Sequence, residues 1–157
     1  MSDTSAPIEL APKRRSHAPH VLNGIRAAGR WVHLALALAI VLGVFVQVYL
    51  IGSYFFGAGQ GALDAHRTAG WTVHGFEMLV FGAALIAWLP RVDLVLSLLL
   101  AVIGTVQVSL ASGHRWVGGL HPLFALIVLG LAAALALRAI GRRRKERGTL
   151  TGGTGRE

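Results

Sequence analysis

Hydrophobic residues occur along the chain in four long runs, which are separated by short segments rich in glycine or polar residues. The runs cover Trp31–Phe56, Thr68–Leu89, Leu94–Leu110 and Trp116–Ile140. An α-helix needs roughly 17–25 such residues to cross the hydrocarbon layer of a bilayer. Backbone amides in lipid must be paired, and the sequence lacks the alternating segments of an outer-membrane barrel. The pattern therefore predicts an all-α membrane protein, an up-and-down bundle of four transmembrane helices.

The composition of the 157 residues agrees with this class, since 54% are apolar, 14% are charged and the mean hydropathy is +0.61. A soluble domain usually has about 25% charged residues. The chain has no cysteine, which excludes disulfide bonds and thiolate chemistry. It also has no nucleophile with a base at useful spacing, no HExxH and no phosphate-binding glycine loop. A hydrolase is therefore not expected.

The formal net charge of +8 is distributed unevenly. Most of the 15 basic residues lie before the first run or after the last, and Arg91 lies between the second and third. The positive-inside rule then predicts that both termini are cytoplasmic, with outward loops around 57–65 and 111–115. No nucleic-acid-binding motif accompanies the charge, so we expect the basic residues to contact anionic lipid rather than DNA or RNA.

These observations divide the chain into three parts. Residues 1–29 and 142–157 are expected to be disordered basic tails on the cytoplasmic side. Residues 30–141 are expected to form the four-helix transmembrane domain. The protein is accordingly expected to be a multi-pass protein of the bacterial cytoplasmic (inner) membrane.

Two similar polar segments occur within this apolar sequence. Residues 66–74 read HRTAGWTVH, and residues 114–121 read HRWVGGLH. Each segment follows a span that contains a glutamine, in GVFVQVYL at 43–50 and in GTVQVSL at 104–110. Because glutamine, histidine, arginine and glycine recur in one order, spans one and two are predicted to be repeated as spans three and four.

Up-and-down threading makes spans two and four parallel, with both beginning at the outer face. His66 and His114 then lie near the outer interface, and His74 and His121 lie about two turns deeper, roughly 10–12 Å at the rise of an α-helix. At about 100° per residue, His114 and His121 share one face of their helix. Matching depths pair His74 with His121.

Facing histidines on two helices of a bundle are a suitable axial ligand pair for haem iron. Gly70 and Gly118 leave a flat recess beside the imidazoles, although close helix packing alone also explains glycines at such positions. Arg67 and Arg115 each follow a histidine and are candidates to pair with haem propionates, or they anchor the helices at the interface. The spacing thus predicts haem b between spans two and four. Four histidines at two depths fit a planar cofactor better than a tetrahedral zinc ion.

Other polar residues are predicted at intramembrane positions. A carboxyl group at Glu77 is expensive to ionise in lipid, so we expect it to be protonated or hydrogen-bonded to a histidine, a glutamine or the cofactor. Gln47 and Gln107 are expected in the outer halves of spans one and three, where interhelical hydrogen bonding is an alternative to cofactor contact. A lone histidine near an interface is usually solvated, and we expect this for His33.

The residues quoted above resemble a known family. DAHRTAG at 64–70 is similar to the HRxxG segment on the second helix of one four-helix half of haem A synthase, and HPLFA at 121–125 is similar to its fourth helix. QVYL and QVSL also fit this pattern. The chain further resembles an uncharacterised family of small bacterial four-helix membrane proteins. The resemblance implies a haem b held by His66 and His121, whereas depth matching pairs His74 with His121, so all three are candidate iron ligands.

Several functions remain open at this point. With one half-bundle and short outer loops, haem A synthesis is not expected. The leading hypothesis is a cytochrome b-like membrane protein in electron transfer or haem handling, working with a redox or complex partner in the membrane. The alternatives are a cofactor-free subunit or interaction partner of a larger complex, and a proton-coupled carrier that uses Glu77 and the histidines. A stand-alone enzyme is less expected than a carrier or subunit.

Overall fold

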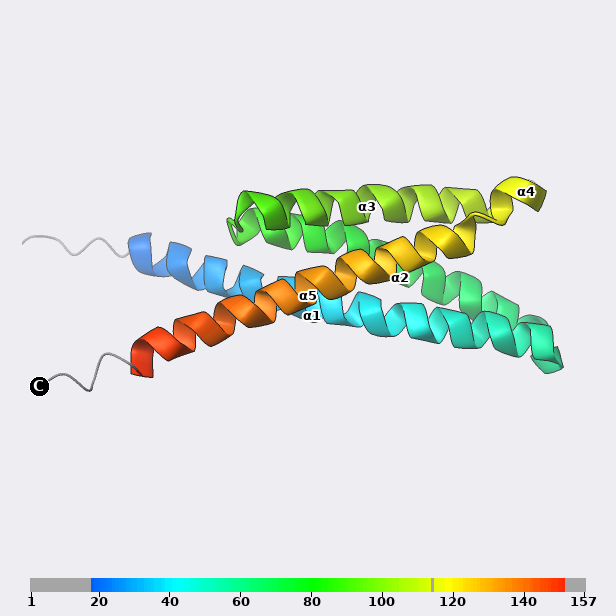
Figure 1. The fold of residues 1–157 in the computed structure, drawn as a ribbon, viewed down its shortest axis with the longest axis horizontal. Helices are drawn as coiled ribbons and strands as arrows, with labels where there is room; N and C mark the ends of the chain where they lie inside the picture. Colours follow the sequence, from blue (N-terminus) through cyan, green and yellow to red (C-terminus); the bar gives the residue numbers. More distant parts are fainter. Residues whose placement is uncertain (1–17, 114, 152–157) are drawn as a thin grey trace, which may run out of the picture.

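The computed structural model describes residues 18–113 and 115–151, and in this part of the chain every regular element is helical. The chain runs alternately in opposite directions along one long axis (Figure 1). The elements in order are α1 (Ala18–Ser53), the short π-helix η1 (Tyr54–Ala58), α2 (Gln60–Ile86), α3 (Arg91–Ala111), the short α4 (Arg115–Gly118) and α5 (His121–Thr151).

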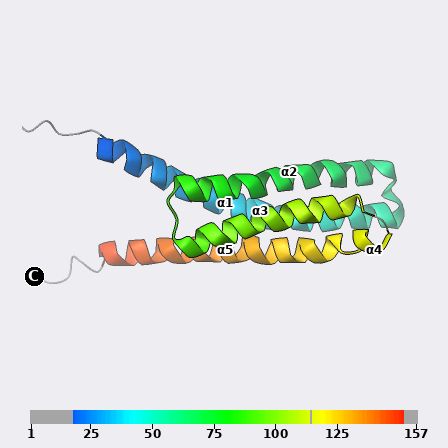
Figure 2. The same cartoon turned by 90° about the horizontal axis from the view of Figure 1, so that it is seen from above.

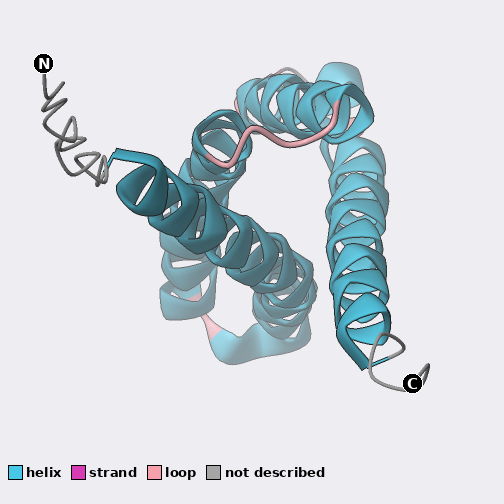
Figure 3. Ribbon diagram, turned by 90° about the vertical axis from the view of Figure 1, so that its left-hand side faces the viewer, coloured by secondary structure: helices cyan, strands magenta, loops and turns pink. Residues whose placement is uncertain are grey.

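Four helical stretches are long and apolar enough to cross a membrane, as the hydrophobic pattern predicts. They cover His20–Ala58, Gln60–Ile86, Arg91–Ala111 and Arg115–Gly148. Helix α1 packs against α2 and α5, and α3 packs against the same two helices. Figure 2 shows these helices lengthwise, and Figure 3 shows from one end that they surround a common axis. The protein is thus a multi-pass membrane protein with a four-helix bundle.

Small and branched residues form the core between the helices. The fully buried ones include Ala37, Ile40, Val80, Leu100, Ala132 and Leu135. Alanines at these positions let the helix backbones approach closely, which is the usual way that helices associate in lipid. Many large apolar side chains point outward instead, as a lipid-facing surface requires. Examples are Leu42, Phe45, Leu99, Leu126 and Leu137.

The turn after α1 differs from the predicted outer loop at 57–65. Gly57 and Gly59 have φ angles of 93° and 80°, a region that glycine adopts without a Cβ penalty. These two residues reverse the chain within a few positions, and α2 already begins at Gln60. The predicted loop length is therefore wrong, because much of the segment is the first part of α2.

The fourth span is interrupted near its start, whereas a continuous helix was predicted over Trp116–Ile140. Helix α4 ends at Gly118, and α5 begins only at His121. Two adjacent glycines disfavour helix at this point. Pro122 follows as the second residue of α5, where its missing N–H costs no hydrogen bond. This break decides the level at which His121 lies.

Helical structure extends into both segments for which disordered tails were expected. Helix α1 begins at Ala18, and α5 continues to Thr151. Pro19 lies in the first turn of α1, where proline is tolerated. The stretch RRRKER near the end of α5 consists of good helix formers. Residues 1–17 and 152–157 lie outside the described part of the chain. We call the end of the bundle where α1 begins and α5 ends the basic end.

Candidate functional site

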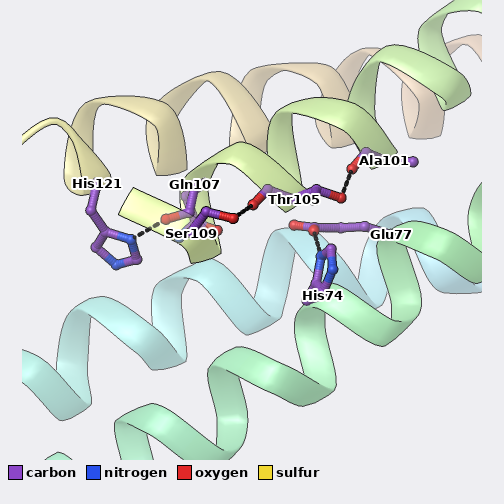
Figure 4. A network of polar contacts seen from close by, with 7 residues as sticks. All are labelled: His74, Glu77, Ala101, Thr105, Gln107, Ser109 and His121. Atoms are coloured by element: carbon purple, nitrogen blue, oxygen red, sulfur yellow. Dashed lines mark hydrogen bonds and ion pairs between the residues drawn. The ribbon is translucent and has the colours of Figure 1, made fainter. Parts of the chain in front are cut away.

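Two histidines make the same contact in the two halves of the bundle. His66 of α2 has its Nδ1 atom 3.1 Å from the backbone oxygen of Gln47 in α1. His121 of α5 has its Nδ1 atom 2.9 Å from the backbone oxygen of Gln107 in α3 (Figure 4). The glutamine–histidine order that led us to predict a repeat therefore corresponds to one recurring structural contact.

This contact determines which ring nitrogen carries the proton. A carbonyl oxygen only accepts hydrogen bonds, so the Nδ1 atoms of His66 and His121 donate. In a neutral imidazole the Nε2 atom then keeps its lone pair. Histidines that bind metals are commonly oriented in this way, with the second nitrogen donating to a backbone carbonyl. Both imidazoles are thus prepared to ligate through Nε2.

The two rings lie against each other across the bundle. Their centroids are 6.3 Å apart, and the ring planes meet at 78°. Two imidazoles on opposite sides of one metal, with bonds of about 2 Å and ring radii of about 1.2 Å, have centroids about 6.4 Å apart. The observed separation is close to this value, so it would suit two histidines that bind one metal from opposite sides. It also lies within the ordinary range for an edge-to-face aromatic contact.

A large cavity opens beside the two rings. Its volume is about 1140 Å³, somewhat above the roughly 300–1,000 Å³ of typical ligand sites. All five α-helices and η1 contribute to the wall, and most of the lining side chains are apolar. The polar and glycine positions in the wall are Gln47, His66, Arg67, Gly70, Glu77, Gln107, Ser109, Ser112, Gly118, Gly119 and His121.

Gly70 makes room for the amide of Gln47 in the cavity wall. A Cβ atom at Gly70 would lie 2.7 Å from Nε2 of Gln47. The Oε1 atom of the same amide is buried and has no hydrogen-bond partner among the described residues. A buried acceptor without a partner is uncommon. The amide of Gln47, in the wall of the cavity, thus carries an acceptor that no described residue pairs.

His74 does not join the pair, contrary to the depth matching. Its Nδ1 atom is 2.9 Å from Oε2 of Glu77, and its ring lies edge-on to Trp71 with centroids 6.1 Å apart. Figure 4 shows His74 directed toward Glu77 rather than toward His121. The depth count assumed one continuous fourth helix. Because α5 begins at His121, this residue reaches the level of His66, which is the pairing that the family resemblance implied.

Glu77 of α2 lines the cavity, and its carboxyl group extends to α3. Its side chain is 1% exposed, and it forms the expected hydrogen bond to a histidine. The carboxyl group fits against Gly104, since a Cβ atom there would overlap Oε2 and Cδ and would lie 3.0 Å from Oε1. Gly104 was quoted in the repeat, but its role in accommodating Glu77 depends on helix packing.

The predicted arginines and His114 take different places. Arg67 lines the cavity and lies 3.3 Å from the exposed carboxylate of Asp64. Arg115 begins α4 and is exposed, and it is not part of the cavity wall. His114 lies outside the described residues. Within residues 18–113 and 115–151, no three histidine, acidic or cysteine side chains converge on one ion site.

Sequence reasoning missed a second polar cluster near the basic end. Asp93 is fully buried and forms ion pairs with Arg138 and Arg142 of α5. His33 is also fully buried, and its Nε2 atom lies 3.0 Å from Oγ of Ser97. The expectation of a solvated His33 is therefore wrong, because this residue of α1 faces α3 and is enclosed in the bundle. The sequence contained one indication of this cluster, since the two arginines are four residues apart and therefore lie on one face of a helix.

Comparisons with protein-family models, curated proteins and solved structures give no match to this chain. The resemblance to one half of haem A synthase therefore stays a prediction that rests on the quoted sequence segments.

Proposed function

We propose that this protein binds haem b in the bacterial cytoplasmic membrane, with His66 and His121 as axial ligands, and acts in electron transfer or haem handling. Both termini are assigned to the cytoplasm on the basis of the positive-inside rule. A bound haem b would supply reversible one-electron chemistry, with its potential set by the axial ligands and their hydrogen bonds.

One observation carries the proposal. Two part-buried histidines on different helices each donate Nδ1–H to a backbone carbonyl, and their rings are 6.3 Å apart beside a cavity of about 1140 Å³. Burying an imidazole nitrogen in this way fixes the tautomer and the ring orientation. Both residues line the cavity, and the helix contacts leave the two Nε2 lone pairs for a ligand.

The other residues of the cavity wall would assist a planar molecule in specific ways. The apolar side chains of the wall would contact the faces of a flat ring system. Arg67 would pair with a carboxylate of the ligand in place of Asp64, since that ion pair is exposed and weak. The amide of Gln47 would turn toward the ligand so that its buried Oε1 atom accepts a hydrogen bond. Glu77 in the cavity wall and its hydrogen-bond partner His74 would hold or exchange a proton.

The same site also offers one argument for a cofactor-free subunit. The two imidazoles already contact each other edge to face, which is a stable arrangement for aromatic rings without any ligand. In that case the glutamine–histidine contacts would serve only to fix the helix pairs. The two functions differ in whether the purified protein carries haem.

A reduced-minus-oxidised absorption spectrum distinguishes them. The full chain is expressed with haem available, purified in neutral detergent and measured. We expect the spectrum of a six-coordinate, low-spin b-type haem. The variants His66→Ala and His121→Ala should lose this spectrum, whereas His74→Gln, a change on the same helix as His66, should keep it. A colourless wild-type protein refutes haem binding, and normal six-coordinate haem in His121→Ala refutes the ligand assignment.

A further inference from the structure

A second cavity, separate from the histidine site, lies between α1 and α5 at the basic end. Its volume is about 260 Å³. The wall contains four arginines and a single acidic residue, together with two alanines and a tryptophan. The complete lining is Ala27, Arg30, Trp31, Ala139, Arg142, Arg143, Glu146 and Arg147. A cavity of this composition carries a strong positive potential.

Arg142 and Arg143 are among the guanidinium groups that the protein holds in place. The Cζ atom of Arg143 lies 3.2 Å from the ring centroid of Trp31, a cation–π contact between α5 and α1. Arg142 forms an ion pair with Asp93, which is fully buried in α3. Guanidinium groups that are already oriented lose little entropy when they bind an anion.

Among the residues that line this cavity, the arginines outnumber the single carboxylate of Glu146. Arg30, Arg142 and Arg147 all lie close enough to Arg143 for their charges to oppose its charge, and Glu146 is the acidic residue that attracts it. The carboxylate of Asp93 is also shared between Arg138 and Arg142. A bound anion would relieve this repulsion. Phosphate suits the site because arginine binds phosphate oxygens through two parallel hydrogen bonds.

We propose that this cavity binds the phosphate of an anionic phospholipid headgroup. The cavity lies where the apolar surfaces of α1 and α5 give way to the basic segments. Large apolar side chains are exposed on both helices, among them Val32 on α1 and Leu137 on α5. A lipid whose phosphate is held by the arginines would place its acyl chains along the apolar surface of these helices. Basic pockets between transmembrane helices are known to select such headgroups.

The position favours a lipid over a soluble phosphate compound. Trp31 is exposed beside the cavity, and tryptophan prefers the headgroup level of a membrane. Ala27 and Ala139 leave apolar wall that a free phosphate ion would not use. The inference is independent of haem binding, because the two cavities share no lining residue.

Native mass spectrometry of the full chain in neutral detergent tests the proposal. The protein is titrated with phosphatidylglycerol and with phosphatidylcholine of the same acyl chains, and separately with inorganic phosphate. We expect one phosphatidylglycerol to be retained at least tenfold more tightly than phosphatidylcholine. Equal retention of the two lipids by the wild-type protein overturns the proposal, and this comparison requires no variant. Inorganic phosphate that binds as tightly as the lipid overturns the assignment to a headgroup.

Matched arginine variants locate the site. Arg143→Gln and Arg30→Gln should each weaken phosphatidylglycerol retention about tenfold, which corresponds to about 1.4 kcal/mol. Arg144→Gln removes the same charge from the neighbouring position, which is exposed and outside the cavity wall. It should change retention by less than about twofold. Equal losses in all three variants would show non-specific charge attraction and would refute a defined site.

Discussion

Replacing Gly104 with alanine tests whether the close contact between α2 and α3 is built around Glu77. Gly104 is buried in α3, and an added Cβ atom would overlap Oε2 and Cδ of Glu77. Ordinary van der Waals contact requires about 3.5 Å between such atoms. The carboxyl group would have to move by more than about 1 Å, and the overlapped Oε2 atom is the one hydrogen-bonded to His74 at 2.9 Å.

The expected cost follows from three contributions. Inserting a methyl group into a packed core usually costs about 1–3 kcal/mol. Losing the hydrogen bond between Glu77 and His74 would add about 1–2 kcal/mol. The higher helix propensity of alanine would return about 0.5–1 kcal/mol. We therefore expect Gly104→Ala to lower the free energy of unfolding by about 1–4.5 kcal/mol.

A denaturant titration in mixed micelles, followed by helical circular dichroism, measures this quantity. Gly82→Ala is the matched control, because Gly82 lies in α2 and an added Cβ atom there would have no neighbour within 4 Å. We expect this control to be neutral or stabilising by up to about 1 kcal/mol. The contrast between two glycine-to-alanine changes in membrane spans separates packing from helix propensity.

A double-mutant cycle assigns the cost to the carboxyl group. In a Glu77→Ala background the overlapping atoms are absent, so Gly104→Ala should then cost less than about 1 kcal/mol. Two results would refute the reasoning. One is wild-type stability of Gly104→Ala in the presence of Glu77. The other is an equal loss with and without the Glu77 side chain, which would place the strain elsewhere.

Two further changes probe the cluster at the basic end. Asp93→Asn removes a buried charge that two arginines share, and we expect it to lower the free energy of unfolding by about 2 kcal/mol or more. Removing one partner of a fully enclosed ion pair costs about 3–5 kcal/mol. We expect a smaller effect here because both arginine side chains are part-exposed. The same titration on Asp64→Asn, where the ion pair is exposed, should show less than about 1 kcal/mol; equal losses would contradict the role of burial. Ser97→Ala removes the partner of the buried His33 Nε2 atom and should cost about 1–3 kcal/mol. A stability unchanged within about 0.3 kcal/mol would mean that His33 finds another partner.

Much of the candidate site was accessible from the sequence. Gln47, Gln107, His66 and His121 were identified because polar residues are conspicuous in apolar spans and occurred twice in one order. Glu77 was expected to meet a histidine, and it does so at His74. These inferences succeed because a polar group in lipid must find a partner, and the spacing of residues limits which partners it can reach.

The errors concern helix ends and helix rotation. The choice of His74 as the partner of His121 relied on a continuous fourth helix, whereas the helix is interrupted between Gly118 and His121. His33 was taken as solvated because its position was judged by its distance from the start of the apolar run. Helix α1 begins earlier, and His33 faces α3 and is fully buried.

The sequence by itself determined the number of spans, their alternating direction and the set of polar residues between them. These properties depend on run length and composition, which are local, because each span must satisfy its own backbone in lipid. The tertiary structure decided that His66 rather than His74 faces His121, that Gly104 accommodates Glu77, and that Asp93 joins two arginines of α5. Such contacts depend on how far each helix is rotated and where it ends, and these are set by side chains on the neighbouring helices.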